Sequence, residues 1–337
     1  MYHSRFMKNH YDAGHRWGAL LYKNKIDLEK NISFAYDEKR KAFVNDCIPI
    51  YQKYYPEILE EINGICDGAH ISKDIFYTFL LGMYCFTMDN HCTCMACKDD
   101  EHMLFGRNSD FLVSLEKQYD SCYYCYDGFI PFIGNTTAFT QMEDGMNAYG
   151  LAVGLTFICP TPSVRKPGLH AGMLVRYILE HCKSVKEAIT FIKKVPIGSA
   201  QTITMMDATG EMVIIECNPE KVIEIYPKKQ RNPFVATANY FTSDEMQKYQ
   251  PKNIDDWRSH ERYETAQHAL SKTDTYSFEL IKDILSGKYG FMCQYDRRTN
   301  ADTVWSCIYD IKNKKIYRCE GNPSRKRFVE DKRLNFI

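Results

Sequence analysis

The chain has 337 residues, of which 45% are hydrophobic and 26% charged, a balance that is ordinary for a globular protein. Its 43 Lys and Arg residues equal its 43 Asp and Glu residues, so no net field favours binding to nucleic acid or to an anionic membrane surface. The start of the chain has no continuous apolar run, and no stretch long enough to span a membrane follows, so we expect a cytoplasmic protein.

The first 91 residues carry the pattern of helices. Apolar residues at 58, 59, 62, 65 and 66 recur with the spacing of one helix face. Ser72 is placed to cap a second helix, with apolar residues at 75, 76, 79, 80 and 83. The sequence therefore predicts a helical segment ahead of the first strand.

A thiol is followed by a cation and an anion between residues 92 and 110. Cys92 precedes Arg107 and Asp110 by one strand-turn-strand interval. A cysteine reacts as its thiolate, so we expect Arg107 to lower the pKa of Cys92 below the usual value of about 8.5. Asp110 is suited to hold a neighbouring amine. Strand alternation places Cys92 and Cys94 on one face, so geometry alone leaves both thiols as candidates.

The cysteines also allow a rival hypothesis, a structural zinc site. The pairs at 94 and 97 and at 122 and 125 roughly match the spacing of a four-cysteine site. The residues inside each pair, Met95-Ala96 and Tyr123-Tyr124, are typical of strand interiors rather than of zinc knuckles. We therefore expect no metal, and reduced thiols that mostly fill core positions.

The rest of the chain alternates strands and helices. We predict strands within 137–157, a helix after residue 168, and a helix that begins with a capping box at 184–187 and stops near 195. Hairpins are predicted at 202–216 and 303–319, and helices at 257–270 and 277–285. This order alone indicates an α+β protein with antiparallel sheet.

Taken in chain order, five blocks resemble the choloylglycine hydrolase and penicillin V acylase family and its relatives, the acyl-CoA:isopenicillin N acyltransferases. The blocks are Cys92-Thr93 with Gly106-Arg107-Asn108-x-Asp110, residues 144–156, Ala236-Thr-Ala-Asn239, Ser259-His-Glu-Arg262 and residues 303–310. These families are N-terminal-nucleophile hydrolases. The acyltransferase branch carries a helical segment before its nucleophile, so the chain resembles that branch most closely.

The resemblance implies a four-layer αββα sandwich over residues 92–337, preceded by a helical pro-segment, residues 1–91. The chain would cut itself before Cys92 and keep the pro-segment as its partner in a heterodimer; further homo-oligomerisation is left open. The substrate would be a small N-acyl amide, with acyl-CoA left open as a donor, and no cofactor is implied.

Roles for individual residues follow from the same resemblance. Cys92 would be the nucleophile and its own α-amine the base, while Arg107 tunes the thiol and Asp110 holds the amine. Asn239 would stabilise the oxyanion and Arg262 would be a second positioning cation. The alternatives are a surface ion pair for Arg107 and Asp110, a loop side chain bonded to its own backbone for Asn239, and a solvated helix face for Arg262.

Two positions depart from the family pattern. His91 stands where the acyltransferases usually have Gly, and its bulk predicts slower cleavage. Thr156 stands where bile salt hydrolases have Asn and penicillin V acylases have Tyr, so that oxyanion group is not reproduced. The candidates for an acyl pocket are Tyr123, Tyr124, Phe129, Phe132 and Phe157. The alternative function is a catalytically idle, zinc-stapled or partner-binding protein of the same fold.

Overall fold

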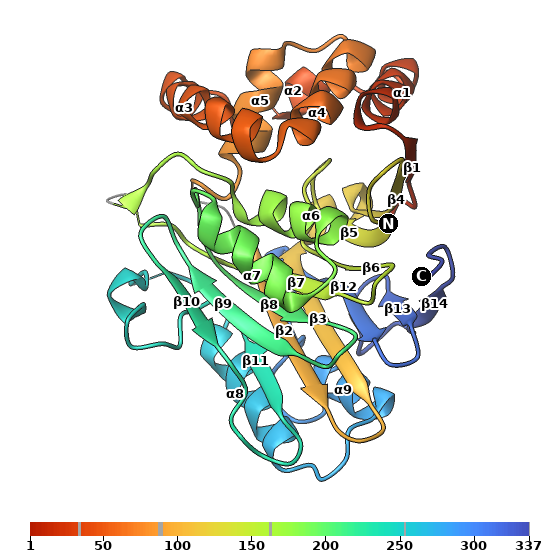
Figure 1. The fold of residues 1–337 in the computed structure, drawn as a ribbon, viewed down its shortest axis with the longest axis vertical. Coiled ribbons are helices and arrows are strands. Elements are labelled where there is room, and N and C mark those ends of the chain that lie inside the picture. Colours follow the sequence, from red (N-terminus) through yellow and green to blue (C-terminus); the bar gives the residue numbers. More distant parts are fainter. Residues whose placement is uncertain (33–34, 87–89, 162–163, 253, 337) are drawn as a thin grey trace.

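A computed structural model describes residues 1–32, 35–86, 90–161, 164–252 and 254–336. Its helices form two groups, one within the first 82 residues and one among the later strands (Figure 1). The helices are α1 (His10–Lys23), α2 (Leu28–Ile32), α3 (Glu38–Tyr54), α4 (Pro56–Ala69), α5 (Lys73–Gly82), α6 (Ala171–His181), α7 (Val185–Lys194), α8 (Ser259–Ser271) and α9 (Phe278–Leu285). In the described part of the chain, no helix is both long and apolar enough to cross a membrane.

The strands form two sheets. One has eight strands in the order β1-β4-β5-β6-β7-β8-β9-β10, and the other has six in the order β11-β2-β3-β12-β13-β14. The strands are β1 (Arg5–Lys8), β2 (His91–Lys98), β3 (Met103–Leu112), β4 (Asp120–Tyr126), β5 (Phe132–Thr136), β6 (Asp144–Asn147), β7 (Ala152–Ile158), β8 (Ala200–Met206), β9 (Met212–Cys217), β10 (Val222–Ile225), β11 (Phe234–Thr237), β12 (Ala301–Asp310), β13 (Lys315–Cys319) and β14 (Val329–Asp331). In the described part of the chain, β1 pairs with β4 in parallel, and the other neighbouring strands of both sheets pair antiparallel. The predicted hairpins are confirmed as β8 with β9 and β12 with β13.

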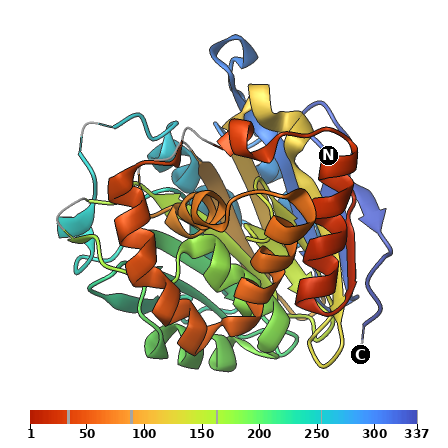
Figure 2. The same ribbon diagram turned by 90° about the horizontal axis from the view of Figure 1, so that it is seen from above.

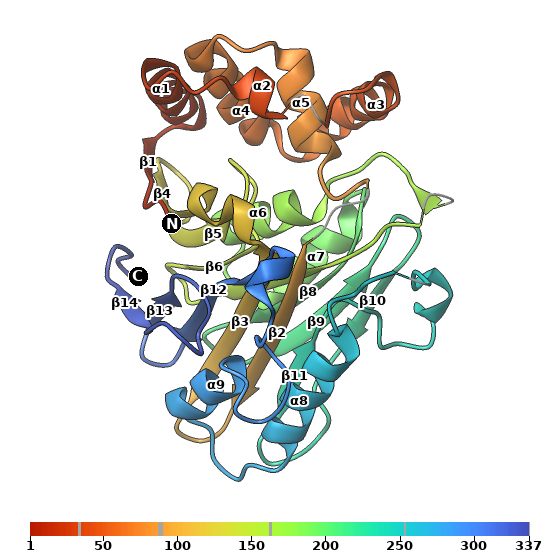
Figure 3. The ribbon, with the colours of Figure 1, turned by 180° about the vertical axis from the view of Figure 1, so that it is seen from behind.

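The layers stack as helix, sheet, sheet and helix. α6 contacts strands of the eight-stranded sheet, β2 contacts β7 and β8 across the interface between sheets, and α8 and α9 contact the six-stranded sheet. Figure 3 shows α8 and α9 on the outer face of β2 and β3. The α+β class and the αββα sandwich predicted from the sequence are therefore confirmed.

One predicted strand region is shorter than expected. Residues 137–143 form no strand, and pairing resumes only at β6. Polar side chains in this stretch bond locally instead: Gln141 donates to the hydroxyl groups of Thr136 and Thr137, and Thr137 donates to Glu143. Such side-chain bonds compete with a sheet ladder.

The N-terminal helices form a fifth layer on top of α6 and α7 (Figure 2). α1 and α4 pack backbone to backbone. The helices are so close that a Cβ on Gly14 would lie 2.2 Å from the carbonyl oxygen of Glu61, and one on Gly64 would lie 2.2 Å from that of Tyr11. Only glycine permits this approach.

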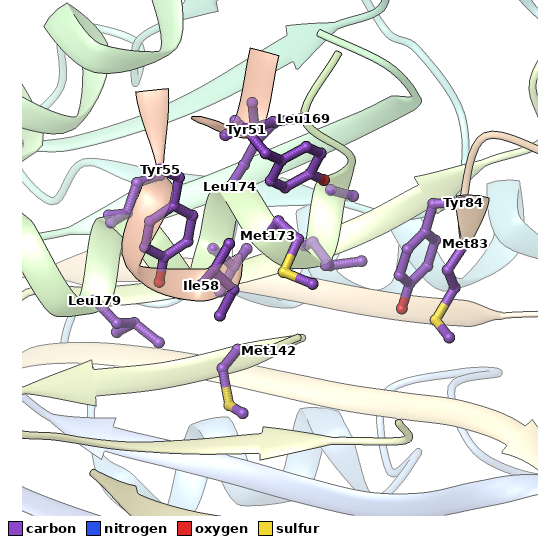
Figure 4. Close-up of a cluster of buried hydrophobic side chains, with 14 of the residues drawn as sticks. Tyr51, Tyr55, Ile58, Met83, Tyr84, Met142, Leu169, Met173, Leu174 and Leu179 are labelled. Atoms are coloured by element: carbon purple, nitrogen blue, oxygen red, sulfur yellow. The ribbon is translucent and has the colours of Figure 1, made fainter. Parts of the chain in front are cut away.

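A single hydrophobic cluster joins this fifth layer to the sandwich. Figure 4 shows Tyr51, Tyr55 and Ile58 from the N-terminal helices facing Met173 and Leu174 of α6. All five side chains are fully buried. Because the layers share one core, the N-terminal helices α1 to α5 are an integral part of this fold rather than a loosely attached arm.

Candidate active site

Two paired strands place Cys92 beside Arg107. In the antiparallel register of β2 and β3, Cys92 lies opposite Ser109 and Cys94 lies opposite Arg107, so all four side chains share one face. Arg107 Nη2 donates to Cys92 Sγ at 2.7 Å. The facing strand makes room for the guanidinium at Gly154, where a Cβ would lie 3.0 Å from Arg107 Cδ.

Arg107 is completely buried among acceptors. Its Nη1 donates to Asp144 at 2.8 Å, its Nη2 to Glu143 at 3.2 Å, and its Nε to the carbonyl oxygen of Leu155 at 3.1 Å. A surface ion pair is therefore the wrong interpretation of Arg107, whose exposed fraction is 0%. The charge of the guanidinium is held within hydrogen-bond distance of a thiol and away from water.

The expected low pKa of Cys92 is not found in the uncut chain. Burial raises the pKa of the thiol well above its ordinary value, and the positive charge of Arg107 opposes this only in part, while Glu143 adds to the rise. The spacing of the sequence indicates the cation, but it indicates neither the desolvation of the sulfur nor the carboxylate beside it.

Asn239 and Arg262 hold the backbone on both sides of the Cys92 side chain. The Cys92 N–H donates to Asn239 Oδ1 at 2.8 Å, and its carbonyl oxygen accepts from Arg262 Nη1 at 2.6 Å. Arg262 Nη2 also donates to Asn239 Oδ1 at 2.9 Å, which leaves the amide nitrogen of Asn239 as the donor toward Phe157 O, at 2.7 Å. Arg262 is fully buried on α8, so a solvated helix face is the wrong interpretation.

Asp110 lies near this group but not on the Cys92 nitrogen. It accepts from Thr303 Oγ1 at 2.6 Å and from the Tyr295 hydroxyl at 3.0 Å, and it lies 3.6 Å from Arg262. Burial raises the pKa of Asp110 to about 6 although these partners lower it. Its exposed fraction is 0%, which rules out the surface pair. A role beside the free amine remains a prediction for a cleaved chain.

Thr156 and Phe157 lie on β7, and both contact the segment that carries Asn239; a role for the Phe157 ring in an acyl pocket stays a prediction. The Thr156 hydroxyl donates to the carbonyl oxygen of Ala238 at 2.7 Å and bonds to the Thr202 hydroxyl. The carbonyl oxygen of Phe157 accepts from Asn239, and its ring lies 5.3 Å from that of Tyr84. Thr156 is thus occupied within the sheet interface.

The other aromatic pocket candidates lie elsewhere. Tyr123 and Tyr124 are on β4, three strands from β7 in the sheet order, and Phe132 is on β5. Tyr124 stacks on Phe6 and Phe132 and lies under the guanidinium of Arg176. Phe129 packs against the His10 ring of α1. Tyr124, Phe129 and Phe132 belong to the core shared with the N-terminal helices, whereas Tyr123 packs against the cluster between the two sheets, and none of the four has a recorded contact with Cys92.

Sequence reasoning missed two groups that touch the thiol and its cation. Cys92 Sγ donates to Asn90 Oδ1 at 3.1 Å, and Asn90 Nδ2 donates to the Tyr84 hydroxyl at 3.5 Å. Glu143 accepts from Arg107, Ser109 and Thr137. The only sequence signal for Glu143 is its position directly before the block at 144–156.

The zinc hypothesis finds no cluster in the structure. Cys94 and Cys97 are on β2 of the six-stranded sheet, whereas Cys122 and Cys125 are on β4 of the eight-stranded sheet. Among the described residues, no group of three or more His, Cys, Asp or Glu side chains is arranged to hold a metal ion.

Removing the Arg107 cation should make Cys92 harder to ionise. We expect Arg107→Ala to raise the pH of half-maximal Cys92 alkylation by about one to two units, because a charge-assisted hydrogen bond to the thiolate is lost. Alkylation rate against pH, with Cys92 located by peptide mapping, measures this. Arg298→Ala, at an exposed pair with Asp296, is the control. An unchanged profile in Arg107→Ala would show that the contact does not influence the thiol.

Comparison with known proteins identifies a sequence family and a fold. The family model described as acyl-coenzyme A:6-aminopenicillanic acid acyl-transferase matches residues 97–325, beginning just after Cys92. No curated protein matches the chain in sequence.

Two solved structures share the fold at low identity. The Caenorhabditis elegans ortholog of N-acylethanolamine-hydrolyzing acid amidase is 16% identical, with a TM-score of 0.51 over 66% of this chain and 93% of that one. A variant of the conjugated bile acid hydrolase from Clostridium perfringens is 14% identical, with a TM-score of 0.52 over 71% of this chain and 92% of that one.

Proposed function

The chain belongs to the acyl-coenzyme A:6-aminopenicillanic acid acyl-transferase family, whose members catalyse amide hydrolysis or acyl transfer. From this premise we propose that it is a self-processing cysteine enzyme that acts on linear amides of N-acyl substrates. The observation that carries the proposal is the Arg107 guanidinium 2.7 Å from Cys92 Sγ. Asn239 and Arg262 support it by fixing the backbone of the same residue.

Maturation comes first in this proposal. Cys92 Sγ attacks the carbonyl carbon of His91, the C–N bond to Cys92 breaks, and the nitrogen takes up the thiol proton. Water then hydrolyses the thioester, which leaves a carboxylate on His91 and a free thiol and α-amine on Cys92. Residues 1–91 become a pro-segment bound to the catalytic chain, residues 92–337.

Turnover uses the same sulfur. The α-amine of Cys92 takes the thiol proton while Sγ attacks an amide carbonyl, and the amine product leaves with a proton. Water, or an incoming amine or thiol, then releases the acyl group. Acyl-CoA is a candidate donor, because Sγ can attack its thioester carbonyl in the same way, with the CoA thiol as the leaving group. Asn239 Nδ2 is the proposed oxyanion donor, worth about 3 kcal/mol in comparable sites, and Arg262 fixes its orientation through Oδ1.

The burial of the thiol supports this order of events. Cys92 has an exposed fraction of 0%, and Asn90, which precedes the proposed cleavage site, bonds to its sulfur. A substrate carbonyl can reach Sγ only after this segment moves. We therefore place cleavage, which releases residue 91 from residue 92, before turnover.

A substrate panel combined with intact mass tests the proposal. We expect purified protein to contain chains of residues 1–91 and 92–337 and to release an amine from an N-acyl substrate. The first panel is penicillin V, glycine- and taurine-conjugated bile acids and N-acyl amino acids. Alkylation of Cys92, located by peptide mapping, should abolish the release. An intact chain without turnover would favour the idle, partner-binding alternative, and turnover that survives Cys92 alkylation would exclude the thiol mechanism.

A further inference from the structure

The imidazole of His91, directly before the proposed nucleophile, occupies an unusual position. It is buried, with 7% of its surface exposed, and it stacks on the Trp257 indole with ring centroids 4.6 Å apart and an interplanar angle of 18°. Neither ring nitrogen has a hydrogen-bond partner among the described residues. Burial, with the nearby charge of Arg262, lowers the pKa of His91 to about 3, so the ring is neutral. The space that the His91 ring fills against the Trp257 indole, called the slot below, therefore holds a flat, uncharged ring and offers its nitrogen atoms no hydrogen bond.

Trp257 is held in this position by a strained turn. Trp257 and Arg258 have φ values of +51° and +57°, a region that bulky residues rarely adopt. The carbonyl oxygen of Trp257 accepts from Arg262 Nε at 3.0 Å and from the Tyr295 hydroxyl at 3.5 Å. Arg262 also binds the Cys92 carbonyl, and Tyr295 also binds Asp110. Trp257 is thus tied to the same groups that surround the nucleophile, and such strain is often kept at functional sites.

We propose that the slot on Trp257 is the acyl-group subsite of the mature enzyme, and that Trp257 selects acyl groups with a flat, uncharged ring two carbons from the carbonyl. The inference rests on the proposed function, because maturation and turnover then pass through a thioester on one sulfur. In maturation the acyl group on Cys92 Sγ is that of His91, whose ring is separated from the carbonyl by Cα and Cβ. In turnover the substrate carbonyl carbon takes the place of the His91 carbonyl carbon, so its substituent points into the same slot.

Hydrolysis of the first thioester vacates the slot. It leaves His91 as a chain end with a free carboxylate, no longer joined to the strand that held its ring on Trp257. A 3-phenylpropanoyl group, or an aromatic aminoacyl group, then fits better than imidazole, because a phenyl ring has no nitrogen atoms that need partners. A straight-chain acyl group of similar size loses the ring stacking.

Paired substrates measure the selection. We expect the mature enzyme to hydrolyse 3-phenylpropanoyl p-nitroanilide with a kcat/KM about two- to tenfold above that for nonanoyl p-nitroanilide, whose acyl group has the same number of carbons, as one aromatic stacking contact allows. Trp257→Leu should bring this ratio close to 1, and Trp257→Phe should keep most of it. Tyr289→Leu, which removes an exposed aromatic side chain, is the matched control and should keep the parental ratio. Thermal melts of each variant verify folding.

The outcomes separate this inference from the proposed function. Three outcomes with a cleaved enzyme would overturn the subsite and leave the cysteine mechanism standing. They are no preference for the ring, no turnover of either anilide, and a ratio that is unchanged in Trp257→Leu. A parent chain that stays uncut and inactive overturns the proposed function, and the subsite with it.

Discussion

Cys92→Ala protein is expected to remain a single chain of 39.4 kDa, whereas the parent separates into residues 1–91 and 92–337. The alanine side chain has no group that can attack the His91 carbonyl, and Arg107 loses the sulfur to which it donates. Turnover should fall by at least about a thousandfold, as when other enzymes lose their nucleophile. Intact mass and a denaturing gel measure cleavage, and release of amine measures turnover.

Cys94→Ala provides the matched control. Cys94 lies on the same strand face, is equally buried and is the second thiol candidate in the sequence. Its sulfur donates to the carbonyl oxygen of Leu155, whereas that of Cys92 donates to Asn90. We expect this variant to cleave normally. Cleavage at another bond, normal cleavage in Cys92→Ala, or loss of cleavage only in Cys94→Ala would assign the nucleophile elsewhere.

The sequence predicted the part of the site that depends on regular strands. Cys92 and Arg107 are fifteen positions apart, and a strand, turn and returning strand bring them together whatever the rest of the chain does. The hairpins follow from similar local patterns, whereas the order of the four layers was implied only by the family resemblance. Asn239 and Arg262 could be singled out only through resemblance, because the amphipathic pattern of the helix that carries Arg262 fits solvent exposure equally well.

The contacts that the sequence did not predict are made by irregular chain or depend on burial. Asn90 precedes its strand, Glu143 follows a stretch without strand pairing, and Trp257 lies in a turn with positive φ. No periodicity marks such positions. The elevated pKa of Cys92 depends on complete desolvation, and Tyr124 of β4 belongs to the core because another layer covers it. Composition cannot distinguish a covered ring from a pocket ring.

A second large effect is expected at the contact between the N-terminal helices and α6. Arg176 donates to Glu61 of α4 at 2.7 Å and to Glu180 at 3.0 Å, and none of the three is more than 1% exposed. The Tyr55 hydroxyl donates to Glu180 at 2.6 Å, and the His10 ring bonds to the same carboxylate. Every charge in this cluster has a partner, so its stability depends on all its members being present.

Arg176→Met should lower the free energy of unfolding by about 3–5 kcal/mol, because two buried carboxylates lose their cation. Chemical denaturation measures the loss, and Arg298→Met at an exposed pair is the control that should change little. Adding Glu61→Gln and Glu180→Gln should recover part of the loss by removing the stranded charges. If the single variant unfolds like the parent, the cluster has no net stabilising role.

The pH dependence of this effect has a defined sign. Burial raises the pKa of Glu180, but Arg176 and His10 outweigh it and lower the pKa to about 2. A carboxylate with a depressed pKa contributes stability above its unfolded pKa, about 4.3, and loses that contribution as the pH falls toward its folded value. The parent and Arg176→Met should therefore converge in stability between about pH 5 and pH 2.

The same cluster should help to hold the two chains of a cleaved enzyme together, because Glu61, Tyr55 and His10 all precede residue 91. We expect cleaved Arg176→Met enzyme to release its pro-segment on gel filtration at a lower denaturant concentration than the cleaved parent. Equal retention would mean that the shared hydrophobic core, rather than this cluster, holds the two chains together.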